Sequence, residues 1–212
     1  MTIFVVEETT MPKKGMRGIR RQQFINAAIK VILQDGLTGI SNARIAMLAG
    51  LSPSLLPHYF PDRTLLLDAI LRQILRRCHT IAKEHLNRHE DPLDRLHILI
   101  NTHFRDDLFT PEMKRLCRDM HHATYDSKIL KATYGTYQNR LLSAVRCELH
   151  PLVSARSLDA ASSGFIALLN GLWMKALYEP ALLQPADAVD LQKQYLRMIT
   201  TRIRIKAGDS LG

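Results

Sequence analysis

The sequence is poor in cysteine and aromatic residues and has no long apolar run. Its three cysteines, Cys78, Cys117 and Cys147, are an odd number at wide spacing. They form neither a disulfide framework nor a paired zinc motif, which favours a reducing compartment. The longest apolar stretch, residues 165–174, falls short of the roughly 20 residues that a membrane span needs. Residues 1–10 lack a basic residue, so we expect no signal peptide and a cytoplasmic protein.

The motifs of common enzyme classes are also missing. The sequence contains no Walker loop, no GxGxxG turn and no GxSxG elbow. His85 and His89 have the spacing of metal ligands on a helix, as do Cys117 and His121, but Leu86 stands where a zinc protease has its glutamate. The sequence thus yields no catalytic residue, metal site or cofactor. An all-helical enzyme stays open only as a constellation of distant residues.

Positive charge exceeds negative charge and is concentrated near the N-terminus. The chain has 29 Lys and Arg against 20 Asp and Glu, a net charge of +9. Residues 11–63 have a net charge of +6, although the segment 64–212 is nearly three times as long. Such a density indicates an acidic partner, most often nucleic acid. A solvated basic helix face and a surface for anionic membranes remain as alternatives.

Apolar residues recur at helical spacing throughout, and no stretch alternates as a strand does. Ser52-Pro53, Asp91-Pro92 and Thr110-Pro111 each join a capping side chain to a proline that suits the first helical turn. We therefore predict an all-α fold of about nine helices. The predicted ranges are 17–34, 41–49, 53–60, 64–90, 92–107, 111–125, 127–149, 157–178 and 185–204.

Residues 41–63 carry the most informative pattern. One short helix ends at Gly50, and after a turn a second short helix begins at Pro53. Small residues near the turn, Ala46 and Ala49, allow two helices to cross closely. Apolar residues are expected to pack the pair against the first helix: Ile45, Leu48, Leu51 and Leu56. A helix–turn–helix presents its second helix to the DNA major groove, but periodicity alone leaves an ordinary helical hairpin equally open.

These residues resemble the N-terminal signature of TetR-family repressors, at Ile45-Ala46, Ala49-Gly50-Leu51-Ser52, His58-Tyr59-Phe60, Arg63 and Leu65-Leu66-Leu67. Residues 11–22 and 170–173 are further similar to the BetI group of this family, which represses betaine-synthesis genes in response to choline. The resemblance implies a homodimer with a DNA-binding domain at residues 11–63 and a helical regulatory and dimerisation domain at 64–212. Residues 1–10 are then an extension, which we expect to be disordered.

The resemblance also implies the DNA contacts. Bases face Ser54, Leu55, Pro57 and His58, while phosphates are held by Asn42, Arg44, Tyr59 and Arg63. Ser52 opens this recognition helix, and the basic segment with Lys13, Lys14 and Arg17 follows the neighbouring DNA backbone. No Arg, Asn or Gln occupies residues 53–60, so DNA shape is expected to contribute to specificity. Pro57 is a departure, because a proline this deep removes a backbone hydrogen bond and should kink or tighten the helix.

Two apolar stripes near the C-terminus predict the dimer interface. They comprise Phe165, Leu168, Leu169 and Leu172 in one helix, and Tyr195, Leu196, Ile199 and Ile203 in the next. Two such stripes from each chain form a four-helix bundle across a two-fold axis, and the symmetry implies a palindromic operator. The alternative is that both stripes pack on the core of their own chain.

A choline-like effector needs aromatic faces, because a quaternary ammonium has no hydrogen to donate. The predicted ligand residues are Trp173, Phe104, Tyr125 and Tyr137. Further candidates are Phe109, Tyr134 and Tyr178, with Asp106, Asp107 and Glu148 as anions. Core packing is the alternative role of each aromatic residue. A different regulon with an unrelated hydrophobic effector is the alternative for the protein.

Overall fold

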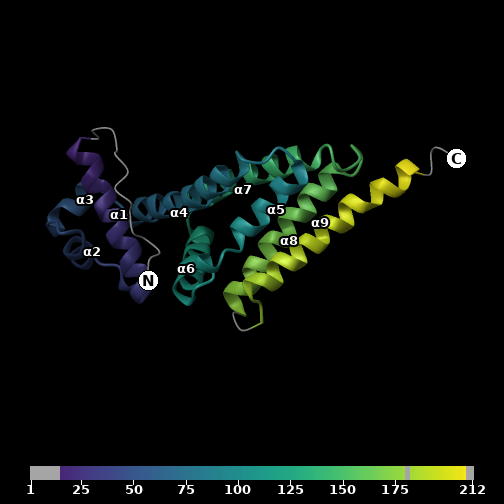
Figure 1. Ribbon diagram of the computed structural model, residues 1–212. Coiled ribbons are helices and arrows are strands. Elements are labelled where there is room, and N and C mark those ends of the chain that lie inside the picture. Colours follow the sequence, from purple (N-terminus) through teal and green to yellow (C-terminus); the bar gives the residue numbers. More distant parts are fainter. Residues whose placement is uncertain (1–14, 180–181, 209–212) are drawn as a thin grey trace. The chain divides into compact units, whose positions relative to one another are not determined.

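The computed structural model describes residues 15–179 and 182–208, with side chains up to residue 201. This part of the chain is all α-helical and has no strand, which confirms the predicted fold class (Figure 1). Its helices are α1 (Met16–Asp35), α2 (Asn42–Ala49), α3 (Leu56–Tyr59), α4 (Arg63–Leu86), α5 (Pro92–His103), α6 (Pro111–Asp126), α7 (Lys128–Leu149), α8 (Leu158–Tyr178) and α9 (Pro185–Gly208). Short 3-10 turns are η1 (Leu37–Gly39), η2 (Pro53–Leu55) and η3 (Asp106–Leu108).

The chain forms two compact units that interleave along the sequence. The first unit contains the described residues up to Gln73 and the segment Thr110–Lys131; the second contains Ile74–Phe109 and the residues from Ala132 onward. Helix α6 therefore clusters with the N-terminal helices, although it lies beyond the predicted domain boundary at residue 63. The functional division into residues 11–63 and 64–212 stays a prediction. No helix in the described segments combines the length and apolar character of a membrane span.

The core of the first unit forms around α1. The apolar stripe whose helical spacing indicated this helix is at most 3% exposed, at Ile25, Ala28, Ile29 and Ile32. Helices α2 and α6 both pack against α1. Because α6 comes from a distant part of the sequence, its packing on α1 is a tertiary contact that helical periodicity could not reveal.

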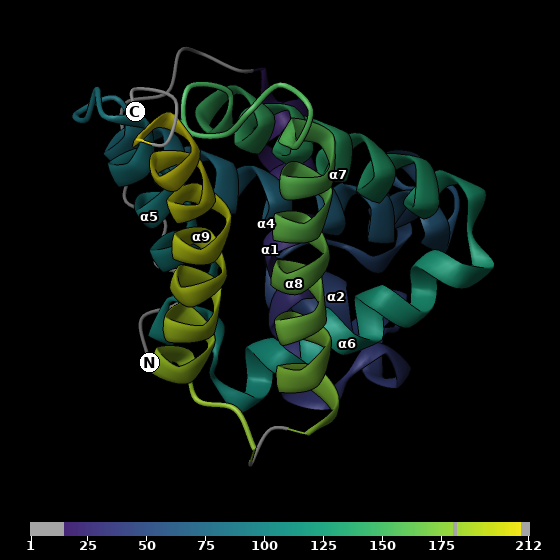
Figure 2. The same ribbon diagram turned by 90° about the vertical axis from the view of Figure 1, so that its right-hand side faces the viewer.

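The core of the second unit lies between α5, α7, α8 and α9. Helices α8 and α9 run side by side in opposite directions (Figure 2). They approach closely at Gly164, where an added Cβ would lie 3.0 Å from Cζ of Tyr195. Glycine at this point of α8 thus leaves room for the Tyr195 ring of α9, whose burial raises the pKa of its phenol.

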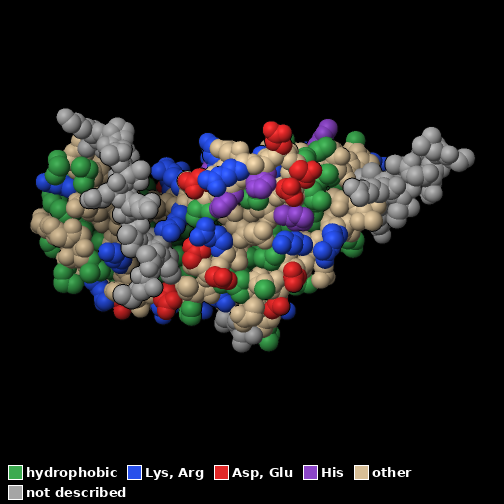
Figure 3. Space-filling view, in the orientation of Figure 1, with side chains coloured by type: hydrophobic (Ala, Val, Ile, Leu, Met, Phe, Trp, Pro, Cys, Tyr) green, Lys and Arg blue, Asp and Glu red, His purple; other side chains and the backbone are tan. Residues whose placement is uncertain are grey.

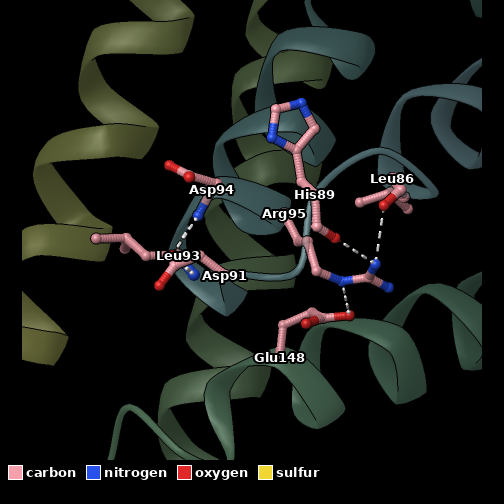
Figure 4. A network of polar contacts seen from close by, with 7 residues as sticks. All are labelled: Leu86, His89, Asp91, Leu93, Asp94, Arg95 and Glu148. Carbon is pink, nitrogen blue, oxygen red and sulfur yellow. Dashed lines mark hydrogen bonds and ion pairs between the residues drawn. The ribbon is translucent and has the colours of Figure 1, made fainter.

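The turn between α4 and α5 is fixed by Arg95 (Figure 4). Its guanidinium donates to the carbonyl oxygens of Leu86 at 2.9 Å and His89 at 3.2 Å, and it pairs with Glu148 of α7 at 2.8 Å. Helix α4 stops at Leu86, where the carbonyl oxygen accepts from the N–H of His89 at 3.2 Å as well as from Arg95, in a tight turn that replaces the helical bond. The prediction that this helix continues to residue 90 was therefore wrong.

Side chains cap two helices as predicted. Asp91 accepts from the backbone N–H groups of Leu93 at 2.9 Å and Asp94 at 3.0 Å, at the start of α5. Thr110 accepts from the N–H of Met113 at 3.2 Å, at the start of α6. Helix α5 ends at His103, not at the predicted residue 107, because η3 follows as a separate turn.

Candidate DNA interface and effector site

Helix α2 has a well-defined start and end. Ser41 precedes it, and its Oγ accepts from the N–H of Arg44 at 3.2 Å. Gly50 ends it in the left-handed region, with φ 66°, a conformation that favours glycine. Ile45 is fully buried, as predicted, whereas Leu48 is 41% exposed. The inward placement of Leu48 was wrong, because only one stripe of so short a helix reaches α1.

The second helix of the motif is broken into two parts. Residues Pro53–Leu55 form the turn η2, and α3 then begins at Leu56 with Pro57 in its first turn, where a missing N–H costs no helical bond. This arrangement confirms the tightening expected from Pro57. The expected cap by Ser52 was wrong: its side chain accepts no backbone N–H, and its Oγ lies 2.8 Å from Oγ of Ser54.

The exposure of the recognition segment matches the side chains predicted to face bases. Ser54, Pro57 and His58 are exposed, and Leu55 is half-buried. Leu56 is 2% exposed and anchors the segment to the core of the first unit. Tyr59 is half-buried, with its ring centroid 5.5 Å from that of Phe24. Base contacts by the exposed residues remain a prediction.

Several predicted phosphate-binding residues lie on the surface. Arg17 and Asn42 are exposed, and Arg21 lies over the Phe60 ring at 4.8 Å from its centroid. Lys13 and Lys14 fall outside the described residues. On the face shown in Figure 3, basic and acidic side chains intermingle over α5 and α9, so no broad basic field covers that part of the second unit.

The other two predicted phosphate ligands already have partners in the protein. Arg44 forms an ion pair with Asp35, the last residue of α1. Arg63 donates from Nη2 to the carbonyl oxygen of Leu37 at 2.7 Å. Asp35 directly follows the predicted helix 17–34, and no binding role was predicted for it. A carboxylate in the last turn opposes the helix dipole, and this unfavourable position was the signal that it has a specific cation as partner.

Three aromatic side chains meet in the second unit. Phe104 and Trp173 stack with centroids 6.4 Å apart, Phe109 lies 5.0 Å from Trp173, and Phe104 and Phe109 are 5.9 Å apart. Phe104 and Phe109 are buried, while Trp173 is half-buried. The structure therefore brings together two of the predicted ligand residues, Phe104 and Trp173, with the further candidate Phe109.

A polar pair lies in the same unit. The imidazole of His103 bonds through Nδ1 to the carbonyl oxygen of Leu99 at 2.8 Å and through Nε2 to the Tyr137 hydroxyl at 3.1 Å. Since the carbonyl can only accept, Nδ1 carries the proton and Tyr137 donates to Nε2. Burial lowers the pKa of His103 and raises the pKa of Tyr137. Burial also raises the pKa of the Cys78 thiol, and the nearby negative charge of Asp107 raises this pKa further.

An open cleft of about 590 Å³ adjoins the aromatic cluster, with Phe104 in its wall. It carries three carboxylates, Asp106, Asp107 and Asp190, against one guanidinium, Arg105, so its charge favours a cation. Asp107 is paired with Arg105 at 2.8 Å, whereas Asp106 and Asp190 are exposed. The candidate anion Glu148 is instead engaged by Arg95.

The remaining aromatic candidates are Tyr125, Tyr134 and Tyr178. Tyr125 belongs to the first unit, is 69% exposed and packs its ring edge-on against His121. Tyr134 accepts from the Gln138 side chain at 2.7 Å, and Tyr178 is 48% exposed near the end of α8. No group of three His, Cys, Asp or Glu in the described segments is arranged to hold a metal ion.

The predicted dimer stripes are largely buried within their own chain. Phe165, Leu169, Leu172 and Leu196 are at most 5% exposed and belong to the core of the second unit. Leu168, Tyr195 and Ile199 are half-buried against the same core, and the Ile203 side chain lies outside the described residues. The core-packing alternative thus fits these stripes, because side chains that one chain already buries offer little area to a second.

The chain is similar to known transcriptional regulators over most of its length, although no protein-family model matches it. The HTH-type transcriptional regulator BetI of Burkholderia ambifaria (strain MC40-6) is 30% identical over 191 residues, covering 89% of this chain and 98% of the relative. BetI of Burkholderia cenocepacia (strain HI2424) is 31% identical over the same lengths. BetI of Rhizobium meliloti (strain 1021) is 29% identical over 88% of this chain and 92% of the relative.

Solved structures of regulators share the fold. A TetR transcription regulator from Haloarcula marismortui matches with a TM-score of 0.76 at 13% identity, covering 86% of this chain and 98% of the other. A transcriptional regulator from Rhodococcus matches at 0.73 and 18% identity, over 84% and 95%. A regulator from Saccharomonospora viridis, solved in complex with choline, matches at 0.70 and 16% identity, over 85% and 96%.

Proposed function

Because this chain belongs to the TetR family of helix–turn–helix transcriptional regulators and is similar to BetI, we propose that it is an effector-controlled repressor. It acts in the cytoplasm as a homodimer on a palindromic operator. A small cation of the choline class releases it from DNA.

The recognition segment carries this proposal. Ile45 and Leu56 bury one side of the motif, so that Ser54, Pro57 and His58 are exposed together on the other. A short and nearly uncharged helix suits the floor of the major groove, where hydrogen bonds and apolar contacts select bases. The surrounding arginines bind phosphates, and these contacts supply affinity that does not depend on the DNA sequence.

Binding to the DNA upstream of the protein's own gene tests the proposal. We expect a protected segment with two half-sites related by a two-fold axis, spaced by about one helical turn or a multiple of it. The variants Arg44→Ala, Arg63→Ala and His58→Ala should each bind more weakly, provided that circular dichroism shows them to be folded. If all three bind as the parent does, this helix–turn–helix is not the DNA-binding element.

The proposed dimer uses a different face of α8 and α9 from the stripes predicted by sequence. Small side chains are exposed along one side of α8, at Ala160, Ser163, Ala167 and Gly171. On α9, Leu191 is 44% and Met198 57% exposed. Small residues let two helices approach closely, and exposed apolar side chains on the neighbouring helix favour a surface that a partner covers. A second copy fits best, since an isologous contact yields the two-fold axis that a palindrome requires.

The effector site is proposed at the aromatic cluster. Phe104, Phe109 and Trp173 offer π-faces, and the neighbouring cleft offers carboxylates; together they suit a quaternary ammonium. The Saccharomonospora viridis regulator, which was solved with choline, supports this class of ligand. Ligand binding would then shift the dimer toward a state with lower operator affinity, and the shift is limited by the difference in effector affinity between the two states.

A further inference from the structure

The turn after α1 holds both arginines that flank the recognition segment. At its start the Asp35 carboxylate pairs with Arg44 of α2, and two residues later the Leu37 carbonyl oxygen accepts from Arg63 at 2.7 Å. The side chains of Arg44 and Asp35 are 42% and 36% exposed. Both groups are therefore within reach of an incoming ligand.

A carboxylate and a DNA phosphate bind the same N–H donors of a guanidinium. Each offers anionic oxygens to the N–H donors of arginine, often in the same two-pronged geometry. If Arg44 holds a phosphate with the donors that Asp35 occupies, the ion pair must open when DNA binds. The two anions then compete for one cation, and each binding event includes the loss of the internal pair.

Helix α6 keeps this turn in place. Arg115 donates to the carbonyl oxygen of Leu33 at 2.6 Å, and the Asp119 carboxylate accepts from the N–H of Leu37 at 3.2 Å. Gly36 between them has φ 72°, a backbone conformation that a non-glycine residue adopts only with strain. The Asp35 carboxylate is therefore held at Arg44 by the local backbone as well as by charge attraction.

We propose that Asp35 is an internal competitor of the operator phosphates, which occupies Arg44 in the DNA-free protein and thereby limits operator affinity. The inference rests on the proposed DNA binding by the helix–turn–helix. The opposite role is that Asp35 positions Arg44 for a phosphate, and the two roles predict changes of opposite sign when the carboxylate is neutralised.

The variant Asp35→Asn separates the two roles, since it keeps the shape of the side chain and removes its charge. Operator binding is measured by fluorescence anisotropy at low salt, with the full-length protein and the upstream DNA. Competition predicts a dissociation constant lower by about two- to five-fold, the range expected for an exposed ion pair. An unchanged or higher dissociation constant overturns the proposal.

Two controls exclude a general charge effect. Glu112→Gln removes one negative charge from an exposed position of α6 in the same unit and should change affinity less than Asp35→Asn. In an Arg44→Ala background, Asp35→Asn should give no further gain beyond that of the Glu112 control, because the contested cation is gone. An equal gain with and without Arg44 contradicts competition. If the parent binds no operator, the proposed function itself fails, and this inference fails with it.

Discussion

The rings of Phe104 and Trp173 stack at a centroid distance of 6.4 Å and an interplanar angle of 20°. Phe104 comes from the end of α5 and also lines the acidic cleft, whereas Trp173 comes from α8. The two residues therefore connect the acidic cleft to the aromatic surface that we propose as the effector site. This pairing is the structural basis for placing the effector in the second unit.

Choline binding should depend on Trp173 and not on Tyr125. We expect Trp173→Leu to weaken choline binding by roughly 2- to 30-fold, the loss of one cation–π contact of about 0.5–2 kcal/mol. Tyr125→Leu is the matched control, because that ring is exposed in the other unit. Isothermal titration calorimetry with choline chloride measures both. A parent that binds no choline at millimolar concentration would refute the choline proposal and leave the DNA-binding proposal standing.

Stability should fall as the pH drops below about 6.5, the ordinary pKa of histidine. Burial lowers the pKa of His103, so between the folded and the unfolded pKa this histidine is protonated in the unfolded chain but neutral in the folded chain. Folding free energy is then lost by at most about 1.4 kcal/mol per pH unit for this group, until the pH reaches its folded pKa.

His103→Gln should flatten the decline of the melting temperature between pH 7.5 and 5.5. His97→Gln is the control, because the pKa of His97 is also lowered by burial but its side chain is less enclosed, and it should flatten the curve less. Thermal unfolding followed by circular dichroism checks both variants. An unchanged pH profile in His103→Gln would show that this histidine is not the buried neutral base described above.

Removing Arg95 should destabilise the second unit. Arg95→Met leaves the Glu148 carboxylate, whose side chain is only 13% exposed, without its cation, and also removes the side-chain hydrogen bonds to two carbonyl oxygens. We expect a loss of about 1–3 kcal/mol in the free energy of unfolding. Arg146→Met should change it by less than about 0.5 kcal/mol, since its pair with Asp159 is exposed on both sides. Urea unfolding compares them, and equal losses would contradict the role of the turn network.

A charge on the proposed dimer face should separate the subunits. Ala167→Glu and Met198→Glu each place a carboxylate on that face, and we expect monomers by light scattering and at least about tenfold weaker operator binding. Ala132→Glu puts the same charge on an exposed position of α7 and should leave the dimer intact. If both test variants are still dimers, the interface lies on another face.

Local signals predicted the helices well. Asp91-Pro92 and Thr110-Pro111 placed the starts of α5 and α6, because capping depends on a few neighbouring residues. The ends of α4 and α5 were predicted too late, since α4 gives way to a turn whose carbonyl oxygens bind Arg95, and α5 gives way to the separate turn η3. The stripes on α8 and α9 were predicted as the dimer interface, with packing on their own chain as the alternative, because periodicity does not tell whether the same chain or a second one covers an apolar stripe.

The site was predictable only in part. The resemblance to TetR-family repressors at Ala49-Gly50-Leu51-Ser52 and His58-Tyr59-Phe60 indicated the recognition segment, and Phe104 and Trp173 were two of the four predicted ligand residues. The ion pair of Asp35 with Arg44 depends on how α1 and α2 cross, and the bonds from α6 join residues 82 positions apart in the sequence. Such long-range contacts leave no periodic trace in one sequence.

Sequence-specific DNA binding by the recognition segment is the central claim, and a comparison of operator with scrambled DNA tests it most directly. Fluorescence anisotropy at two salt concentrations should give the parent at least about a hundredfold preference for operator. Higher salt should weaken binding to both DNAs, and it should reduce the ratio of the two affinities less than it reduces either affinity. His58→Ala, folded by circular dichroism, should lose most of the preference while still binding scrambled DNA as the parent does. If His58→Ala and Ser54→Ala both keep the full preference for operator, the claim that this segment determines sequence specificity is contradicted.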